Sequence, residues 1–489
     1  MDYDVIVVGG GNAALCAALS ASESAKKILV LERAPEDEAG GNSRFTAGLF
    51  RLAYRGPEDL KSVIPDLSAD EIANTDFGTY TEEQFLDDMA RLTEYRCDPD
   101  LTEILVKQSL PTAQWMRKRG VRFTAAWGRQ AFKIGGKFKF WGGLTVEAVG
   151  GGPGLVESEA QIAKKAGIEI WYGARATGLI ADDDGVHGVV VKHQGKTKKI
   201  SSRSVVLAAG GFQANTEWRT RYMGPGWELA KVRGTRFNTG DAIRMALDAG
   251  AAAHGNWSGC HAVAWDRNAP ETGDLAVGDG FQKHSYPWGV YINAEGRRFV
   301  DEGADFRNYT YAKYGRVILQ QPKQFAWQIF DAKVKAQLRD EYRIKQVTRV
   351  TANTLEELVS KLDDTNGVVA LEEIKKYNAA VQTQVPFNPN IKDGRCTKGL
   401  PVNKSNWANT LDTPPFEAYA VTCGITFSFG GLKINTDAQV INSDGEPIKG
   451  LYAAGELVGG IFWFNYPGGS GLTNGAVFGK IAGASAARA

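Results

Sequence analysis

The sequence has no long hydrophobic run and very little cysteine. In 489 residues, no apolar stretch approaches the roughly 20 residues that a membrane-spanning helix needs. The first predicted strand starts within the first few residues and leaves no room for a signal peptide, so we expect a cytoplasmic protein without a membrane span. The five cysteines are odd in number and form no Cys-x-x-Cys pair. Disulfides and a metal site are therefore not expected.

An excess of charge of one sign is also missing. The formal net charge is +1, and the Lys and Arg residues are scattered along the chain. Residues 133–141 interleave lysines with aromatic side chains, but one short patch in a neutral protein is typical of a solvated loop or hairpin. We therefore expect no nucleic-acid partner.

Glycine, in contrast, is abundant and lies at turns. The chain has 57 glycines, grouped in segments such as residues 150–154 and 468–471, without a low-complexity tract. Glycine allows the backbone to approach a neighbouring group closely. This distribution favours a chain that surrounds a large planar cofactor.

The N-terminal segment predicts a dinucleotide-binding unit. Four β-formers at residues 5–8 run into the letters GGGNAA at residues 9–14, which fit the pattern G-x-G-x-x-A. Such a strand, turn and helix bring backbone N–H groups and a helix N-terminus to a pyrophosphate. Glu32 closes the next strand, residues 28–31, where an acidic side chain accepts the ribose hydroxyls. FAD and NAD both use this unit, so it does not choose between them.

Four later segments favour FAD. Residues 40–43 read GGNS, residues 205–211 read as a buried strand ending in a glycine turn, residues 239–241 read TGD, and residues 451–460 read LYAAGELVGG. With these segments the chain resembles the superfamily of FAD-dependent fumarate reductases and succinate dehydrogenases, over nearly its whole length. Residues 42–46 contain no histidine where the membrane-complex relatives attach FAD. The resemblance therefore implies non-covalent FAD.

The resemblance and the glycine-turn pattern together define a set of expected FAD-binding residues that extends from the first strand to the last helix. The set comprises Gly9, Gly11, Asn12, Ala13, Ala14, Glu32, Arg33, Gly41, Asn42, Ser43, Ala174, Ala209, Gly210, Gly211, Asp241, Gly455, Glu456, Ser470, Gly471 and Leu472. In this reading Glu456 binds the ribityl or diphosphate region, and residues 470–472 approach the pyrimidine edge.

The implied fold is α/β, with a Rossmann-like FAD-binding domain of the glutathione-reductase type and an inserted α+β substrate-capping domain. We expect the FAD-binding domain at residues 1–256 and 418–489. The capping domain is expected at residues 257–417, because the sequence there is irregular and rich in Trp, His, Asn and Pro, whereas the C-terminal segment returns to a strand–glycine–helix pattern.

Arg307 is the leading catalytic candidate. It lies a few residues beyond the GRRFVDE segment at 296–302, which matches a stretch of the superfamily that precedes a proton-donating arginine. Because a free guanidinium has a pKa above about 12, Arg307 either relays a proton in a dry site or only clamps a carboxylate. A surface salt bridge to Asp305 or Glu302 is the structural alternative.

Three further residues are expected at the reacting acid. His261 falls where similar enzymes have a histidine that binds a substrate carboxylate, and Tyr466 and Thr426 are expected to help hold the carboxylates. His284 is a weaker candidate. If Arg307 only clamps, the base must come from Tyr466, Tyr309 or His261.

Two departures from the fumarate reductase pattern change the expected substrate. Residues 424–431 read GITFSFGG, with Thr426 and Phe427 in place of two histidines, and residues 465–470 read NYPGGS, with Tyr466 in place of a carboxylate-clamping arginine. With these segments the chain most closely resembles the FAD-dependent tricarballylate dehydrogenases.

The reaction implied by that resemblance is desaturation of a CH–CH bond next to a carboxylate, with hydride transfer to flavin N5. The electron acceptor is left open. Three alternatives also stay open: an ene-reductase of an unsaturated acid, a 3-ketosteroid Δ1-dehydrogenase-like enzyme, and a flavoprotein without enzymatic activity.

Overall fold

The first strand lies inside an eight-stranded sheet. The computed structural model describes residues 1–140 and 142–489, so Trp141 of the basic stretch lies outside the described residues. Strand β1 (Tyr3–Val8) pairs in parallel with β2 (Ile28–Leu31) and with β12 (Lys196–Leu207). The other strands of this sheet are β9 (Glu169–Trp171), β10 (Arg175–Asp182), β11 (Gly185–His193), β19 (Gln439–Ile441) and β20 (Pro447–Ala453). Both β2 and the second half of β1 are fully buried, as expected for parallel strands covered on two faces.

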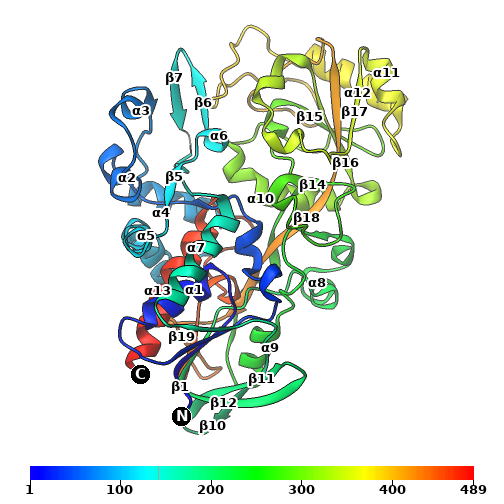
Figure 1. Ribbon diagram of the computed structural model, residues 1–489. Helices are drawn as coiled ribbons and strands as arrows, with labels where there is room; N and C mark the ends of the chain where they lie inside the picture. The colour runs from blue at the N-terminus through cyan, green and yellow to red at the C-terminus, as the bar shows by residue number, and fades with distance from the viewer. Residues whose placement is uncertain (141) are drawn as a thin grey trace.

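Three helices pack together beside this sheet (Figure 1). They are α1 (Asn12–Ala21), α7 (Gly151–Lys165) and α13 (Ser470–Arg488). Helix α13 presents Gly475, Gly479 and Gly483 to α1, one on each successive turn. A Cβ atom added at Gly483 would lie 2.0 Å from the carbonyl oxygen of Ala17. The two helix backbones are therefore in direct contact.

Between β2 and β9 the chain builds a helical layer and two small three-stranded sheets. The helices are α2 (Pro57–Val63), α3 (Ala69–Ala73), α4 (Glu82–Leu92), α5 (Pro99–Arg119) and α6 (Trp127–Gln130). The strands are β3 (Leu49–Phe50), β4 (Thr75–Asp76), β5 (Phe123–Ala125), β6 (Ala131–Ile134), β7 (Lys137–Phe140) and β8 (Val146–Ala148). The basic stretch forms the β6–β7 hairpin, as expected from its sequence.

The second large unit is built on a six-stranded sheet. Its strands are β13 (Lys231–Val232), β14 (Ala253–Asp266), β15 (Val290–Asn293), β16 (Ala326–Phe330), β17 (Arg349–Ala352) and β18 (Phe416–Leu432). Helices in and around it are α8 (Thr216–Met223), α10 (Arg307–Leu319), α11 (Leu355–Ser360) and α12 (Gly367–Ala380). Helix α9 (Asp241–Asp248) packs mainly against β10 of the large sheet. Its own hydrophobic cluster lies between the sheet and helices α11 and α12.

Strands β14 and β18 connect the two units. They pair antiparallel along most of their length and run from the capping sheet down to the large parallel sheet (Figure 1). The expected α/β fold with an inserted capping domain is confirmed. The expected boundaries, between 256 and 257 and between 417 and 418, fall inside these two strands. The division at those residues stays a prediction.

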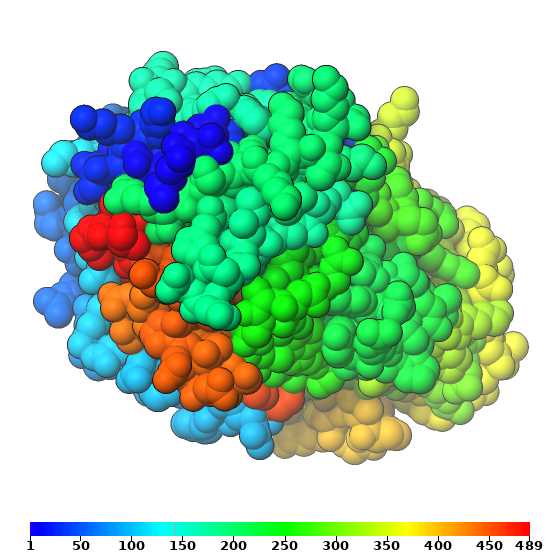
Figure 2. Space-filling model, turned by 90° about the horizontal axis from the view of Figure 1, so that it is seen from below, coloured from blue at the N-terminus to red at the C-terminus, as the bar shows by residue number. Residues whose placement is uncertain are grey.

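Viewed from below, the N-terminal residues (blue) and the C-terminal residues (red) lie on one side of the molecule, and the residues of the capping helices (yellow) lie on the other (Figure 2). Among the described residues, no helix is long and apolar enough to cross a membrane. Nor do the described residues contain a cluster of three or more His, Cys, Asp or Glu side chains that could hold a metal ion.

Substitution Gly483→Ala tests the contact between α1 and α13. Alanine is the better helix former by up to about 1 kcal/mol, but its methyl group meets the Ala17 carbonyl, and overpacking costs roughly 1–3 kcal/mol. We expect a lower melting temperature, because the two helix backbones must move apart to admit the methyl group. Gly178→Ala is the control, since its Cβ meets only Val190 at 3.8 Å. Equal melting temperatures for the two variants would contradict this account.

Candidate active site

A glycine turn at the carboxyl end of β1 forms one wall of a large cavity. Gly9 has a φ of +118°, and a Cβ atom there would lie 2.3 Å from the carbonyl oxygen of Ala208. A Cβ atom at Gly10 would lie 2.3 Å from a carboxylate oxygen of Glu32. No side chain can be added at either position without moving backbone or a buried charge. The turn therefore presents bare backbone and the N-terminus of α1 to the cavity.

Glu32 stands at the end of β2 with its carboxylate buried beside this turn. It accepts a hydrogen bond from the N–H of Ala34 at 2.7 Å. Burial raises the pKa of Glu32, and backbone N–H groups of Ala34, Arg33, Gly10 and Gly40 oppose that rise. The carboxylate is thus an acceptor fixed in position, as the binding of ribose hydroxyls requires.

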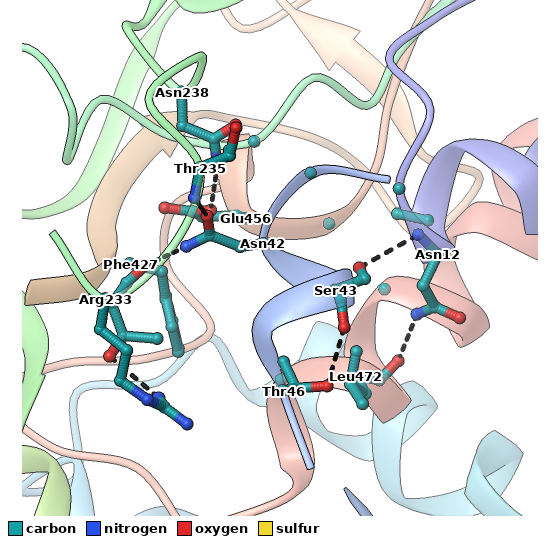
Figure 3. A pocket seen from close by; sticks show the side chains of 18 of the residues that line it. Asn12, Asn42, Ser43, Thr46, Arg233, Thr235, Asn238, Phe427, Glu456 and Leu472 are labelled. Atoms are coloured by element: carbon teal, nitrogen blue, oxygen red, sulfur yellow. Dashed lines mark hydrogen bonds between the residues drawn. The ribbon is translucent and has the colours of Figure 1, made fainter. Parts of the chain in front are cut away.

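Residues far apart in sequence are joined by hydrogen bonds at the start of α1 (Figure 3). The N–H of Asn12 donates to the hydroxyl of Ser43 at 3.1 Å, and the amide of Asn12 donates to the carbonyl of Leu472 at 2.9 Å. The GGNS segment and the last helix are thereby fixed to the glycine turn. This geometry explains why motifs for one site occur both near the start and near the end of the sequence.

Asn42 links the GGNS segment to the capping unit (Figure 3). Its amide donates to the carbonyl of Thr426 at 2.5 Å, and its side-chain oxygen accepts from the N–H of Thr235 at 2.9 Å. The loops after β13 and within β18 are thereby held beside the cavity.

Two other charged groups line the cofactor half of the cavity. Asp241 pairs with Arg33 at 3.1 Å and with Arg175 at 2.8 Å. Glu456 accepts from the N–H of Ser428 at 3.0 Å, and burial raises the pKa of Glu456 to about 8. Its other carboxyl oxygen accepts from the side-chain amides of Gln213 and Asn238, so Glu456 is held in place by the protein at the edge of the cavity.

Most residues expected at FAD line this cavity of about 600 Å³, and three do not. Ala14 is buried in α1, the hydroxyl of Ser470 donates to the carbonyl of Pro467, and Gly211 packs against Ser428 and Glu456. The expected residues that line it are Gly9, Gly11, Asn12, Ala13, Glu32, Arg33, Gly41, Asn42, Ser43, Ala174, Ala209, Gly210, Asp241, Gly455, Glu456, Gly471 and Leu472. The bare glycine turn, the fixed carboxylate and the cavity size fit an FAD molecule.

All four expected catalytic residues line the other end of the same cavity, against the capping unit. Thr426 accepts a hydrogen bond from Arg233 at 3.1 Å, and Arg233 is paired with Asp279 at 2.7 Å. Burial disfavours the charge of Arg233, but Asp279 and Tyr311 raise its pKa above the ordinary value. Arg233 is therefore a permanent positive charge at the cavity wall.

The two histidines of this wall are buried and neutral. Both ring nitrogens of His261 and the Nε2 atom of His284 are buried without a hydrogen-bond partner among the described residues. Burial, followed by the charge of Arg233, lowers the pKa of each histidine well below 6.5. Buried polar atoms are normally hydrogen-bonded, so these atoms are available to a ligand in the cavity.

Tyr466 meets a second tyrosine that sequence reasoning did not identify. The hydroxyls of Tyr466 and Tyr311 are 2.5 Å apart, and the ring of His261 contacts both tyrosines. Tyr309, which was a candidate base, instead donates to the carbonyl of Gly142 and does not line the cavity. Two positions further along α10, Tyr311 lines the cavity in place of the expected Tyr309.

Arg307 begins helix α10 and lines the cavity. Its guanidinium donates to the carbonyl of Arg129, and no ion pair of Arg307 with Asp305 or Glu302 is found among the described residues. Asp305 pairs with Arg91, and Glu302 pairs with Arg298. Burial lowers the pKa of Arg307. The surface salt-bridge alternative is therefore not what the structure contains.

Several cavity residues were missed because no motif marks them. They come from single positions on separate segments: Arg129, Arg175, Arg233, Asp279, Tyr311, Arg339 and Glu341. The only sequence signal was indirect, namely the loss of the clamping arginine at Tyr466, which implies that positive charge must come from elsewhere.

The site and the fold define a flavin-binding oxidoreductase. The chain matches the family described as FAD binding domain over residues 4–472, and it belongs to that family. It is 27% identical to a fumarate reductase (cytochrome) of Shewanella frigidimarina, over 99% of this chain and 77% of that protein.

Two solved structures are also similar. The open conformation of a flavocytochrome c3 fumarate reductase superposes with a TM-score of 0.73 at 26% identity, covering 99% of this chain and 78% of that one. A 3-ketosteroid Δ1-dehydrogenase from Sterolibacterium denitrificans superposes with a TM-score of 0.76 at 20% identity, covering 99% of both chains, and shares the fold. The predictions of FAD and of a flavin-dependent enzyme are confirmed.

Substitution Glu32→Gln tests the cofactor half. The amide would turn an N–H donor toward the Ala34 N–H and offer the ribose a weaker acceptor, so we expect the dissociation constant for FAD to rise about 10–100-fold. Flavin fluorescence during titration of the apoprotein measures it. Glu38→Gln is the control, because Glu38 pairs with Arg236 at the surface. An unchanged FAD affinity in Glu32→Gln would contradict the assigned role.

The two neutral histidines predict that the free energy of unfolding decreases at acid pH. A histidine whose folded pKa is depressed stabilises the fold fully above its unfolded pKa of about 6.5, and this contribution is lost as the pH falls, by about 1.4 kcal/mol per pH unit. We expect His284→Gln to reduce the loss of unfolding free energy between pH 7.5 and 5.5, measured by denaturant titration with saturating FAD. His187→Gln is the control, since His187 lies exposed beside Asp182. If the free energy of unfolding depended on pH equally in His284→Gln and in wild type, this role of His284 would be refuted.

Proposed function

We propose that this protein is an FAD-dependent oxidoreductase that desaturates the CH–CH bond next to a carboxylate in a tricarballylate-like acid. One observation carries the proposal: Arg233, Arg307 and the unpartnered His261 line the same cavity as the FAD-binding residues. Charged and polar groups that converge on a flavin-sized cavity support an anionic substrate held against the cofactor.

In this reaction one substrate carbon would lose a proton to a side chain and its neighbour would lose a hydride, so that a carbon–carbon single bond becomes a double bond. When bound, FAD supplies the two-electron acceptor. The chain's own residues position the acid. We assign the proton to Arg307, whose pKa is lowered by burial, and its planar fork also suits a carboxylate. His261 has two ring nitrogens available for a second contact.

In this proposal Arg233 takes over the role of the clamping arginine, whose position is occupied by Tyr466. Tyr466 is engaged with Tyr311, and Arg233 supplies the positive charge from another loop, at hydrogen-bond distance from Thr426. A carboxylate next to the reacting carbons would be held by Arg233, with Thr426 beside it. Charge that develops on this carboxylate during deprotonation would be stabilised by the same guanidinium.

A steroid-type dehydrogenase is the second candidate. The hydrogen-bonded Tyr311–Tyr466 pair favours it, because phenol groups can bind or deprotonate a ketone without a carboxylate clamp. The ring of Phe427 adds apolar surface beside Tyr466. The guanidinium groups at the cavity weigh against an uncharged substrate, since buried charge requires a partner.

The test is the visible spectrum of the holoenzyme under anaerobic conditions, with tricarballylate, succinate or a 3-ketosteroid added singly. We expect tricarballylate to bleach the flavin, and Arg307→Gln to lower that rate by at least about 100-fold. Lys313→Gln, on the exposed side of the same helix, is the control. Bleaching by the steroid that survives in Arg307→Gln would favour the second candidate. Reoxidation of the reduced enzyme by an unsaturated acid would show the reductase direction.

A further inference from the structure

The cavity continues past Arg233 to a group of arginines at its far wall. Arg339 comes from the segment just before a short 3-10 helix, η8 (Asp340–Tyr342), and Arg129 comes from α6. Arg307 lies next to them, because its guanidinium donates to the carbonyl of Arg129. These three arginines come from three separate elements and line one space.

Arg339 is held in place by contacts that leave part of its guanidinium without a partner. Its backbone N–H donates to the hydroxyl of Ser285 at 3.2 Å, and its Nη1 donates to the carbonyl of Gly128 at 2.6 Å. Its guanidinium lies 4.4 Å from the centre of the Phe132 ring. Its Nη2 is buried and has no hydrogen-bond partner among the described residues. A planar donor fixed in this way is prepared for an acceptor that comes from the cavity.

The charges at this end of the cavity do not balance. Four guanidinium groups, those of Arg129, Arg233, Arg307 and Arg339, line it together with the two buried carboxylates of Asp279 and Glu341. Asp279 is already shared, at 2.7 Å from Arg233 and 3.9 Å from Arg129. Asp340 also lines the cavity, but its side chain is fully exposed to solvent and pairs with Arg343, so it does not neutralise the buried arginines.

The remaining titratable groups at this end do not supply the missing negative charge. His261 and His284 are neutral and add no positive charge. Glu147, near Arg129, is only partly ionised, because burial raises its pKa to about 7. Burial, followed by the charge of Arg307, lowers the pKa of Arg339 to about 9. Positive charge is therefore in excess, as in a site whose counter-ion is an anionic ligand.

We propose that Arg339 forms, with Arg129 beside it, a second anion subsite that binds a carboxylate of the substrate remote from the reacting carbons. This inference rests on the proposed function, in which Arg233 and Arg307 hold the acid at the flavin. It makes Arg339 a specificity-determining residue. An acid with a third carboxylate on a side arm would reach the subsite, whereas the same acid without that carboxylate would leave it empty.

The experiment compares two acids that differ only in the remote carboxylate. Tricarballylate carries a carboxymethyl arm on a succinate skeleton, and methylsuccinate carries a methyl group instead. Their dissociation constants are measured on the oxidised holoenzyme from the flavin difference spectrum and from calorimetry. We expect wild type to bind tricarballylate about 10–100-fold more tightly than methylsuccinate, the range for a charge-assisted hydrogen-bonded pair.

In Arg339→Gln the ratio of the affinities for the two acids should fall to near one. In Arg339→Lys the ratio should lie between that of the glutamine variant and that of wild type. Arg343→Gln is the matched control, because Arg343 lies four residues away, pairs with Asp340 at the surface and does not line the cavity. It should keep the wild-type ratio. FAD content and melting temperature are compared for all variants, and the lysine variant carries the test if the glutamine variant does not fold.

The outcomes separate this inference from the proposed function. A wild-type ratio near one, an unchanged ratio in Arg339→Gln, or equal weakening of both acids would overturn the subsite. Preferential binding of tricarballylate that depends on Arg339, without any bleaching of the flavin, would support the subsite and overturn the desaturase. If tricarballylate bleaches the flavin but the affinity ratio does not depend on Arg339, the desaturase would be supported and the subsite overturned.

Discussion

Direct backbone contact at the carboxyl end of strand β1 is the constraint on which the rest of the structure depends. The turn after β1 lies against Ala208 and Glu32 with no room for a Cβ atom, and helix α13 lies against α1 in the same way. Such contacts are possible only for glycine, and they bring four distant segments to one place. The cavity exists because these segments meet without side chains between them.

Electrostatics organise the two ends of the cavity differently. At the cofactor end, charges are paired within the protein, as with Asp241 between Arg33 and Arg175. At the capping end, four arginines line the cavity with only two buried carboxylates, and two histidines stay neutral. Backbone dipoles at the cofactor end suit a diphosphate, while under the proposed function the arginine-rich end holds the anionic substrate.

The sequence predicted the cofactor end far better than the capping end. Motifs such as GGGNAA and GGNS are local, because a turn and the start of a helix are made by neighbouring residues, and nearly all of the residues named from them line the cavity. At the capping end Arg129, Arg233 and Arg339 come from three segments, each with one useful residue, so no spacing reveals them. Tyr311 was missed because helix phase, not proximity in sequence, decides whether position 309 or 311 faces the cavity.

The same geometry sets the order of events during biosynthesis. The glycine turn and Glu32 are translated more than 400 residues before Gly455 and Leu472 of the same cavity. Until α13 has packed against α1, the early turn is an exposed strand end with no closed pocket behind it. Flavin capture is therefore a late event, and a chain arrested before α13 would be colourless even if most of its sheet had formed.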